Sequence, residues 1–226
     1  MPTYVHYGCG VQAPTTWQNF DASPTLVFER LPLIGRLYTR NAVRFPKHVR
    51  YGDITRGLPI APETCAGIYA SHVLEHLSLH EFRLALKNTY TLLMPGGVFQ
   101  LVVPDIEQLV RRYLESDAPT AAHTLMNDTV MGWHTRPHGL MGLITLWMGH
   151  SHHLWMWDFK ALQELSQVGF GEIQRINFGD FEDPMFEQVQ HPFQFMGAVG
   201  VQCCRPDTKA GSQTATTTAR ATEAVT

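Results

Sequence analysis

The sequence predicts an α/β domain in which a mostly parallel sheet is covered by helices on both faces. Short apolar segments alternate with segments of helical period over residues 4–116, which is the pattern of strands joined by helical connections. The segment CAGIYA (65–70) is continuously apolar, as strands buried on both faces of a parallel sheet are. Several strands end in a glycine or an acidic residue, so we expect a ligand site at the carboxyl edge of the sheet.

Five strands are expected in the first half of the chain. They cover residues 4–8, 17–23, 48–54, 65–70 and 98–104. Only eight residues separate the first two strands, which is too few for a crossover helix of ordinary length. The segment 24–40 has helical spacing that Pro32 interrupts.

A helix is predicted from Ser78 onward, because Ser78 and Glu81 form the pattern of a capping box. Its apolar face repeats with a period of 3.6 residues and is followed by the helix-ending sequence MPGG. A second helix is expected at 105–116 and a third, capped and ended by glycine, at 158–170. The segments 171–179 and 193–204 complete the sheet as two closing strands.

Composition and charge limit the kinds of partner. The 226-residue chain is 44% hydrophobic and carries a formal net charge of -3, which predicts one well-buried core without the basic surface that nucleic acid requires. The N-terminus has no signal-peptide pattern, and no apolar stretch approaches the length of a membrane span. Four scattered cysteines show no disulfide framework. We therefore expect a cytoplasmic protein without stable membrane insertion.

The expected domain covers residues 1–205. Residues 117–157 are rich in His, Met and Trp and interrupt the alternation of strands and helices, so we interpret them as an insertion that covers the acceptor side of the sheet as a lid. Its segment 131–157 is apolar enough to form a homodimer contact. Residues 206–226 are rich in Thr and Ala without apolar period, which predicts a disordered tail.

Four consecutive strand ends carry residues suited to a nucleoside. Gly8-Cys9-Gly10 follows the first strand, Asp21 the second, Asp53 the third and Ser71-His72 the fourth. Glycines allow close approach of the backbone, and a carboxylate can accept hydrogen bonds from both ribose hydroxyls. Asp53 is placed to accept from an adenine amino group. Asp21 comes too soon after the glycines for a dinucleotide site, which expects its acid about 20 residues further on.

The motifs HYGCG, WQNFDAS, GDI, IYASHVLEHL and LLMPGGVFQLVVPD, in this order within residues 4–105, resemble those of class I S-adenosylmethionine-dependent methyltransferases of a small type-11-like subgroup. The segment MWDFKALQELSQVGFGEI is similar to the late helix and strand of that family. The resemblance implies a seven-stranded sheet whose last strand is antiparallel, and S-adenosylmethionine as cofactor. It also implies a set of cofactor-binding residues: Tyr7, Gly8, Cys9, Gly10, Asp21, Ala22, Asp53, Ile54, Ser71 and His72.

The chain departs from the family pattern at its glycine motif. The usual acidic residue at the start of that motif is replaced around His6 and Tyr7, and the interval from Gly10 to Asp21 leaves little room for the first helix. We expect the glycine loop to make fewer backbone contacts with the cofactor than in the family.

The function expected from the resemblance is methyl transfer to a small-molecule or saccharide-like acceptor, at oxygen or nitrogen. Candidate residues on the acceptor side are His72, Glu75, His76 and Asp105, with His152 and His153 as further candidates for a general base. A non-catalytic cofactor-binding or interaction module with the same fold is the alternative.

Residues 72–76 also spell H-x-x-E-H, a zinc-peptidase signature whose two histidines face one side of a helix. A zinc metallopeptidase is therefore a further alternative. The histidines between His134 and His153 match no closed zinc pattern, so we expect them to be solvated or to pack in the lid, and we expect no metal site.

Overall fold

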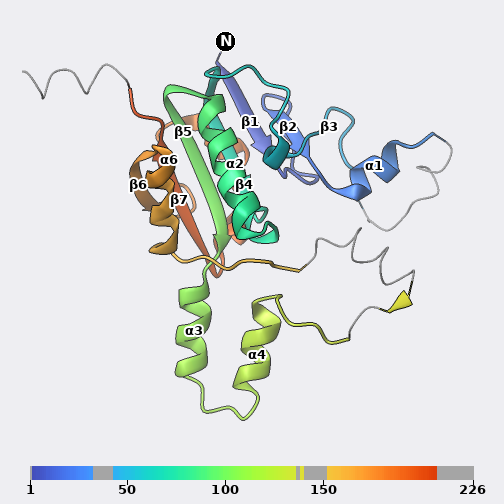
Figure 1. The fold of residues 1–226 in the computed structure, drawn as a ribbon, viewed down its shortest axis with the longest axis vertical. Coiled ribbons are helices and arrows are strands. Elements are labelled where there is room, and N and C mark those ends of the chain that lie inside the picture. Colours follow the sequence, from blue (N-terminus) through green and yellow to red (C-terminus); the bar gives the residue numbers. More distant parts are fainter. Residues whose placement is uncertain (1, 33–42, 136–137, 140–151, 208–226) are drawn as a thin grey trace, which may run out of the picture.

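The computed structural model describes residues 2–32, 43–135, 138–139 and 152–207 (Figure 1). It contains a seven-stranded sheet in the order β3-β2-β1-β4-β5-β7-β6. The strands are β1 (Thr3–Tyr7), β2 (Gln18–Asp21), β3 (Arg50–Tyr51), β4 (Cys65–Ser71), β5 (Leu93–Pro104), β6 (Gly171–Ile176) and β7 (Ala198–Cys204).

One strand of the sheet runs against the others. β7 is antiparallel to both of its neighbours, β5 and β6, whereas β1, β2, β3, β4 and β5 pair in parallel. The prediction of a seven-stranded α/β sheet with an antiparallel last strand is confirmed. Strand order reverses between β1 and β4, and the carboxyl edge at such a reversal is the usual ligand position in sheets of this kind.

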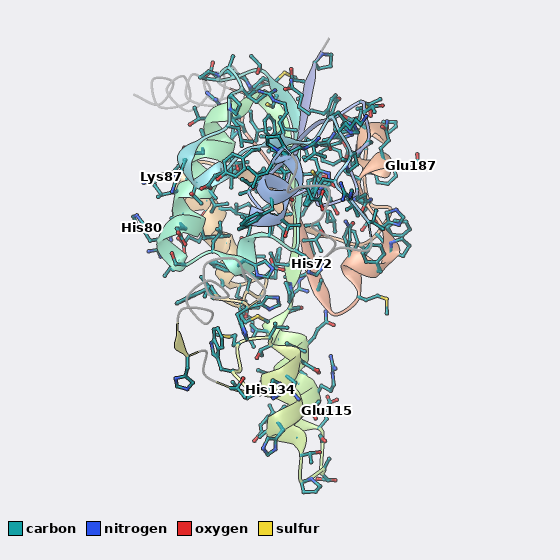
Figure 2. All side chains as sticks on the ribbon, turned by 90° about the vertical axis from the view of Figure 1, so that its right-hand side faces the viewer. His72, His80, Lys87, Glu115, His134 and Glu187 are labelled. Atoms are coloured by element: carbon teal, nitrogen blue, oxygen red, sulfur yellow. The ribbon has the colours of Figure 1, made fainter. Side chains whose placement is uncertain are left out.

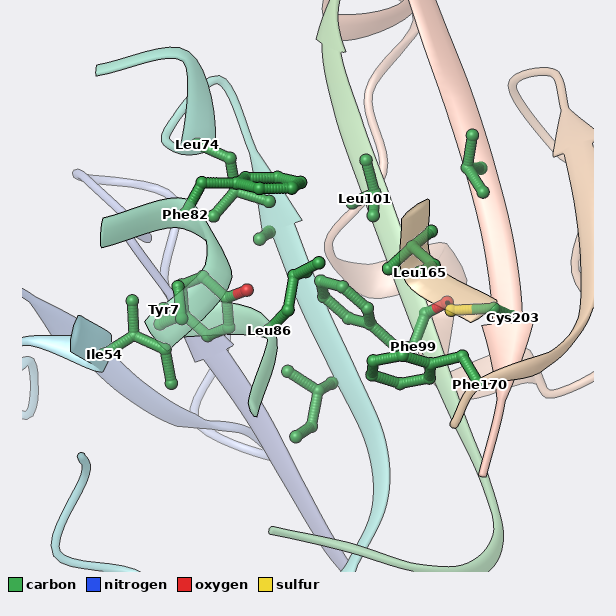
Figure 3. Packing of buried hydrophobic residues seen from close by; sticks show 14 of the residues in the cluster. Tyr7, Ile54, Leu74, Phe82, Leu86, Phe99, Leu101, Leu165, Phe170 and Cys203 are labelled. Atoms are coloured by element: carbon green, nitrogen blue, oxygen red, sulfur yellow. Dashed lines mark hydrogen bonds between the residues drawn. The ribbon is translucent and has the colours of Figure 1, made fainter. Parts of the chain in front are cut away.

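One face of the sheet carries the main core and is covered by α2 (Leu79–Leu92) together with the short elements η3 (Ala161–Glu164) and α6 (Leu165–Val168). Phe82 and Leu86 of α2 are fully buried against Tyr7 and Phe99 of the sheet, as Figure 3 shows. The predicted capping box is present: Ser78 Oγ accepts from the Glu81 N–H, and the Glu81 carboxylate accepts from the Ser78 N–H. This helix confirms the sequence prediction.

The opposite face is covered by two 3-10 helices, η4 (Pro184–Gln188) and η5 (Pro192–Phe195). Phe186 and Val189 pack there against Trp17, Tyr69 and Val102, which form a second buried cluster. The connection between β1 and β2, residues 8–17, contributes no helix, as its expected shortness predicts. The helix that follows β2, α1 (Pro24–Arg30), is capped by Ser23 and lies at the side of the sheet.

Two helices extend from the carboxyl edge of the sheet. α3 (Ile106–Leu114) follows β5 directly and packs against α4 (Ala121–Asp128), so that the pair projects away from the sheet (Figure 1). α4 lies in the segment expected to form a lid; residues 140–151 of that segment lie outside the described part of the chain, as do residues 208–226 of the expected tail. None of the helices in the described ranges has the length and apolar character that crossing a bilayer requires.

Several predicted elements are shorter in the structure than the sequence indicated, and three of them show why. The strand expected at 48–54 comprises two residues, because Asp53 caps a 3-10 helix, η1 (Ile54–Arg56). The helix expected at 158–170 is divided into η3 and α6 and ends at Gly169, whose φ is 114°. The strand expected at 193–204 begins at Ala198, because residues 192–195 form η5.

The MPGG sequence does not form a loop after α2. Strand β5 already starts at Leu93, whose backbone is extended (φ -69°, ψ 135°), and passes through the two glycines. The helix ends at Leu92, just before MPGG as predicted, and the chain continues directly into β5.

Candidate functional site

The loop after β1 turns sharply at two glycines. Gly8 and Gly10 have φ of 64° and 54°, values at which residues with a side chain are strained. A Cβ at Gly8 would lie 2.0 Å from Cγ2 of Val73, whereas a Cβ at Gly10 would meet no heavy atom within 4 Å. Gly8 thus permits close packing with the segment after β4, and the backbone at Gly10 faces open space.

Asp21 joins this loop to the end of β2. Its carboxylate accepts hydrogen bonds from the N–H groups of Gly10 (2.9 Å) and Ser23 (2.7 Å). Burial raises the pKa of Asp21, while the two backbone donors oppose that shift. Each oxygen accepts one backbone hydrogen bond, which leaves each a lone pair for a ligand. Ala22 is exposed beside it.

Asp53 stands at the end of β3, and its carboxylate is largely used within the chain. Oδ1 accepts from the Thr55 N–H at 2.9 Å and from its hydroxyl at 2.7 Å, and Oδ2 lies 3.3 Å from Arg56 Nε. The residue is the N-cap of η1. Ile54, the next residue, is buried in the main core.

Other residues of the proposed cofactor and acceptor set have their side chains in the interior. Tyr7 is stacked against Phe99, and Cys9 packs with Leu26, so only the backbone of Tyr7 and Cys9 could face a ligand. Asp105 is buried and caps α3 by accepting from the Glu107 N–H at 2.9 Å. This helix-capping role explains why an aspartate stands at this position, and it requires no contact with a substrate.

Ser71 and His72 lie at the carboxyl end of β4, where strand order reverses. Ser71 is buried, and His72 has a φ of 54°, an uncommon value for a residue with a side chain. The His72 N–H donates to the Val102 carbonyl at 2.9 Å, which extends the pairing of β4 with β5. Figure 2 shows His72 at the end of the sheet from which α3 extends.

The His72 ring lies between a carbonyl and a carboxylate. Its Nε2 is 2.8 Å from the Gln194 carbonyl oxygen, and its Nδ1 is 3.3 Å from Glu75 Oε1. Burial lowers the pKa of His72, but the nearby Glu75 carboxylate and the Gln194 carbonyl outweigh this and raise the pKa overall.

Glu75, His76 and His153 meet next to His72. Their possible ligand atoms lie within 4.8 Å of one another, although His153 is far from the other two in sequence. Burial lowers the pKa of His153, while the nearby Glu75 carboxylate opposes that shift. We call Glu75, His76 and His153 the carboxylate–histidine cluster.

The H-x-x-E-H motif does not lie on one helix. Only residues 74–76 form a turn of 3-10 helix, η2, and the long helix starts at Leu79. His72 precedes the turn with its left-handed backbone, so the helical geometry assumed for a peptidase is wrong here. Glu75 and His76 lie in the turn that leads into α2, and their contacts reach backbone far along the chain: the Glu75 carbonyl accepts from the Leu154 N–H, and His76 Nδ1 contacts the His152 carbonyl.

The sequence did not connect His153 with this turn. We expected it to be solvated or to pack in a lid, but it is partly buried and its Nε2 is 4.0 Å from Glu75 Oε1. A contact between residues 75 and 153 leaves no trace in local spacing. The sequence signal that could have indicated this contact is the adjacent pair His152-His153, considered together with the H-x-x-E-H motif at 72–76.

No protein-family model matches the chain, and no curated protein does. Solved structures are similar at low identity. An S-adenosylmethionine-dependent methyltransferase of Thermotoga maritima is 15% identical with a TM-score of 0.47, covering 91% of this chain and 83% of that one. A protein of Pyrococcus horikoshii is 13% identical with a TM-score of 0.49, covering 90% and 82%.

A third similar structure is a phosphoethanolamine N-methyltransferase of Haemonchus contortus in complex with S-adenosylhomocysteine. It is 12% identical with a TM-score of 0.45, covering 92% of this chain and 50% of that one. The strand order and the reversal of β7, and not these distant likenesses, define the fold of the present chain.

Proposed function

We propose that the chain binds S-adenosylmethionine at the carboxyl ends of β1, β2 and β4 and transfers its methyl group to a small-molecule acceptor. The observation that carries this proposal is the hydrogen bond from the Gly10 N–H to the Asp21 carboxylate. It holds a carboxylate and an open glycine backbone together beside the point where strand order reverses. Such a point is where sheets of this kind bind nucleotides.

The residues present fit a nucleoside cofactor. Asp21 offers free lone pairs to two ribose hydroxyls, and the open side of Gly10 lets a ligand approach the backbone. Asp53 is the weaker part of the expected set, since its oxygens already contact Thr55 and Arg56. We therefore assign the ribose to Asp21 and keep Asp53 as a neighbour of the adenine.

The cofactor would supply a methyl group on a sulfonium sulfur that is already an activated leaving group. The protein then has to position the acceptor and exclude water, and it needs no nucleophile of its own. The acceptor side is the region around His72 and the carboxylate–histidine cluster. Both ring nitrogens of His72 are engaged, so this ring is better suited to orient its neighbours than to remove a proton.

Cofactor binding is tested by calorimetric titration with S-adenosylhomocysteine. We expect binding to the wild type and a loss of at least about tenfold in Asp21→Asn, because the amide would lose the negative charge and one of the two acceptor oxygens. Asp128→Asn is the matched control, since Asp128 pairs on the surface with Arg112. Equal affinities of both variants and the wild type would refute the assignment of Asp21.

Catalysis is tested separately. Incubation with S-adenosylmethionine and a panel of hydroxyl- and amine-bearing metabolites, followed by mass spectrometry, should give a methylated product. Binding of the cofactor without any product across the panel would favour the non-catalytic module instead.

A further inference from the structure

The carboxylate–histidine cluster contains a buried charge that the protein leaves without an ordinary partner. The Glu75 side chain is fully buried, and within the described ranges neither of its carboxylate oxygens receives a hydrogen bond. Within the described ranges, the side chains that form ion-pair contacts with Glu75 within 4.0 Å are those of His72 and His153. Burying an ionised carboxylate costs several kcal/mol unless a cation or strong donors compensate for the lost water.

The orientation of His76 prepares it as a metal ligand. Its Nδ1 lies 3.1 Å from the His152 carbonyl oxygen. A carbonyl can only accept, so the proton of a neutral ring is on Nδ1, and the lone pair is on Nε2. Histidine ligands in proteins usually donate their second ring N–H to a carbonyl or carboxylate in this way, which fixes the tautomer.

His72 presents a related arrangement. Its Nε2 faces the Gln194 carbonyl, so in a neutral ring the Nδ1 lone pair points toward Glu75 Oε1 at 3.3 Å. Two electron-rich atoms at that distance repel each other unless a positive charge lies with them. A second proton on His72 would supply this positive charge for the His72–Glu75 contact. A metal ion bound to Glu75 would supply it for the whole carboxylate–histidine cluster.

Backbone hydrogen bonds hold the two halves of the cluster together. The Glu75 carbonyl accepts from the N–H groups of Leu154 (2.8 Å) and Trp155 (3.2 Å). The His152 ring stacks on Trp133 with centroids 4.0 Å apart. Main-chain hydrogen bonds therefore hold the segment of His153 against Glu75, and the side chains are already close to the positions needed to bind an ion.

From these contacts we infer that Glu75, His76 and His153 bind a divalent transition-metal ion, with His72 adjoining it. Two imidazoles and one carboxylate match zinc and its neighbours in the first row better than magnesium or calcium, which prefer oxygen alone. Three protein ligands leave a coordination position open. The ligand atoms, within 4.8 Å of one another, would draw in toward the separation of about 3.4 Å that bonds of 2.0–2.1 Å require at a tetrahedral ion.

The position of the cluster gives the ion a role, which rests on the proposed function. The cluster follows β4, and Val73 between His72 and Glu75 packs against Gly8 of the glycine loop. An ion there would bind an acceptor hydroxyl at its open position and make it more acidic. We therefore expect an acceptor that coordinates metal through oxygen.

The test uses the full chain, freed of metal with a chelator and titrated with CoCl2. Cobalt bound in a four- or five-coordinate site absorbs visible light much more strongly, and at longer wavelength, than the octahedral aqueous ion. We expect one tightly bound ion per chain, and a loss of more than about 100-fold in affinity for His153→Ala and for His76→Ala. His80→Ala is the control, since His80 is exposed and lies just beyond the cluster on α2.

Two outcomes would overturn the metal site: a cobalt spectrum unchanged from that of the aqueous ion at one equivalent, or an equal loss of affinity in His80→Ala and His153→Ala. Circular dichroism shows whether each variant is folded. X-ray absorption of the wild-type zinc complex needs no variant, and we expect two imidazole ligands; a shell of oxygen alone would contradict the assignment.

The same samples are titrated with S-adenosylhomocysteine to separate the two proposals. Metal bound in the absence of S-adenosylhomocysteine binding supports the site and refutes the proposed function. S-adenosylhomocysteine bound without metal refutes the site and supports the proposed function.

Discussion

At the scale of single residues, the segments after β1 and β4 meet in one close contact. Gly8 follows β1 and Val73 follows β4, and the gap between them has no room for a Cβ. The positive φ of Gly8 and the closeness of Val73 are independent reasons for glycine, because one concerns backbone strain and the other packing. Their effects can therefore be separated by mutation.

We expect Gly8→Ala to destabilise the protein by about 2–4 kcal/mol, the sum of a strained backbone and an overpacked contact. The double variant Gly8→Ala with Val73→Ala should recover part of this loss, because it removes the two methyl groups that the new Cβ would meet at 2.0 and 2.9 Å. Urea unfolding of the two single variants and the double variant measures the coupling. Strictly additive losses would mean that Val73 is not the obstacle.

Acidic residues at strand ends divide into two groups at the scale of elements. Asp53 and Asp105 each accept from a backbone N–H two residues later and begin a helix. Asp21 accepts from Ser23 in the same way but also from Gly10, which belongs to another strand end. This second contact ties Asp21 to the glycine loop, which Asp53 and Asp105 do not contact, and the sequence alone does not reveal it.

The capping box of α2 offers a prediction at this scale. Ser78→Ala removes the acceptor of the Glu81 N–H, so we expect α2 to start less stably and the protein to lose about 1 kcal/mol. Ser78→Thr keeps a hydroxyl at the same position and should lose less. Thermal unfolding of both variants decides: equal stability of Ser78→Ala and the wild type would show that the box contributes nothing measurable.

For the whole molecule, the second sheet face contains a buried histidine that links stability to pH. His6 lies on β1, is 2% exposed and packs against Tyr69 with ring centroids 5.3 Å apart. Burial lowers the pKa of His6 from 6.5 to about 3. Below pH 6.5 the unfolded chain therefore binds a proton at this residue that the folded chain does not, and stability falls with falling pH.

We expect the free energy of unfolding to lose up to about 1.4 kcal/mol per pH unit from His6 as the pH drops below 6.5. The variant His6→Phe keeps an aromatic ring without a titrating group, so its stability should depend less on pH by that amount. Urea unfolding of both proteins at several pH values between 7.5 and 4.5 gives the comparison. Parallel curves would exclude His6 as the source.

Much of the fold was predictable because its signals are local. The apolar run at 65–70 and the box at Ser78 and Glu81 each specify an element through neighbouring residues, and both elements are present. The boundaries that failed, at 48–54 and 193–204, are those where a cap or a proline competes with the apolar pattern. There the outcome depends on packing against elements distant in sequence.

The sequence by itself determined the alternation of strands and helices, the order of the glycines and acids at the strand ends, and the short first connection. These follow from hydrophobic period, capping and turn chemistry, which act over a few residues. Only the tertiary structure decided which of those acids bonds the glycine loop, and that His153 lies against Glu75 and His76. Contacts of that kind depend on how the whole sheet brings the strand ends and the segment around His153 together, and local spacing does not encode that arrangement.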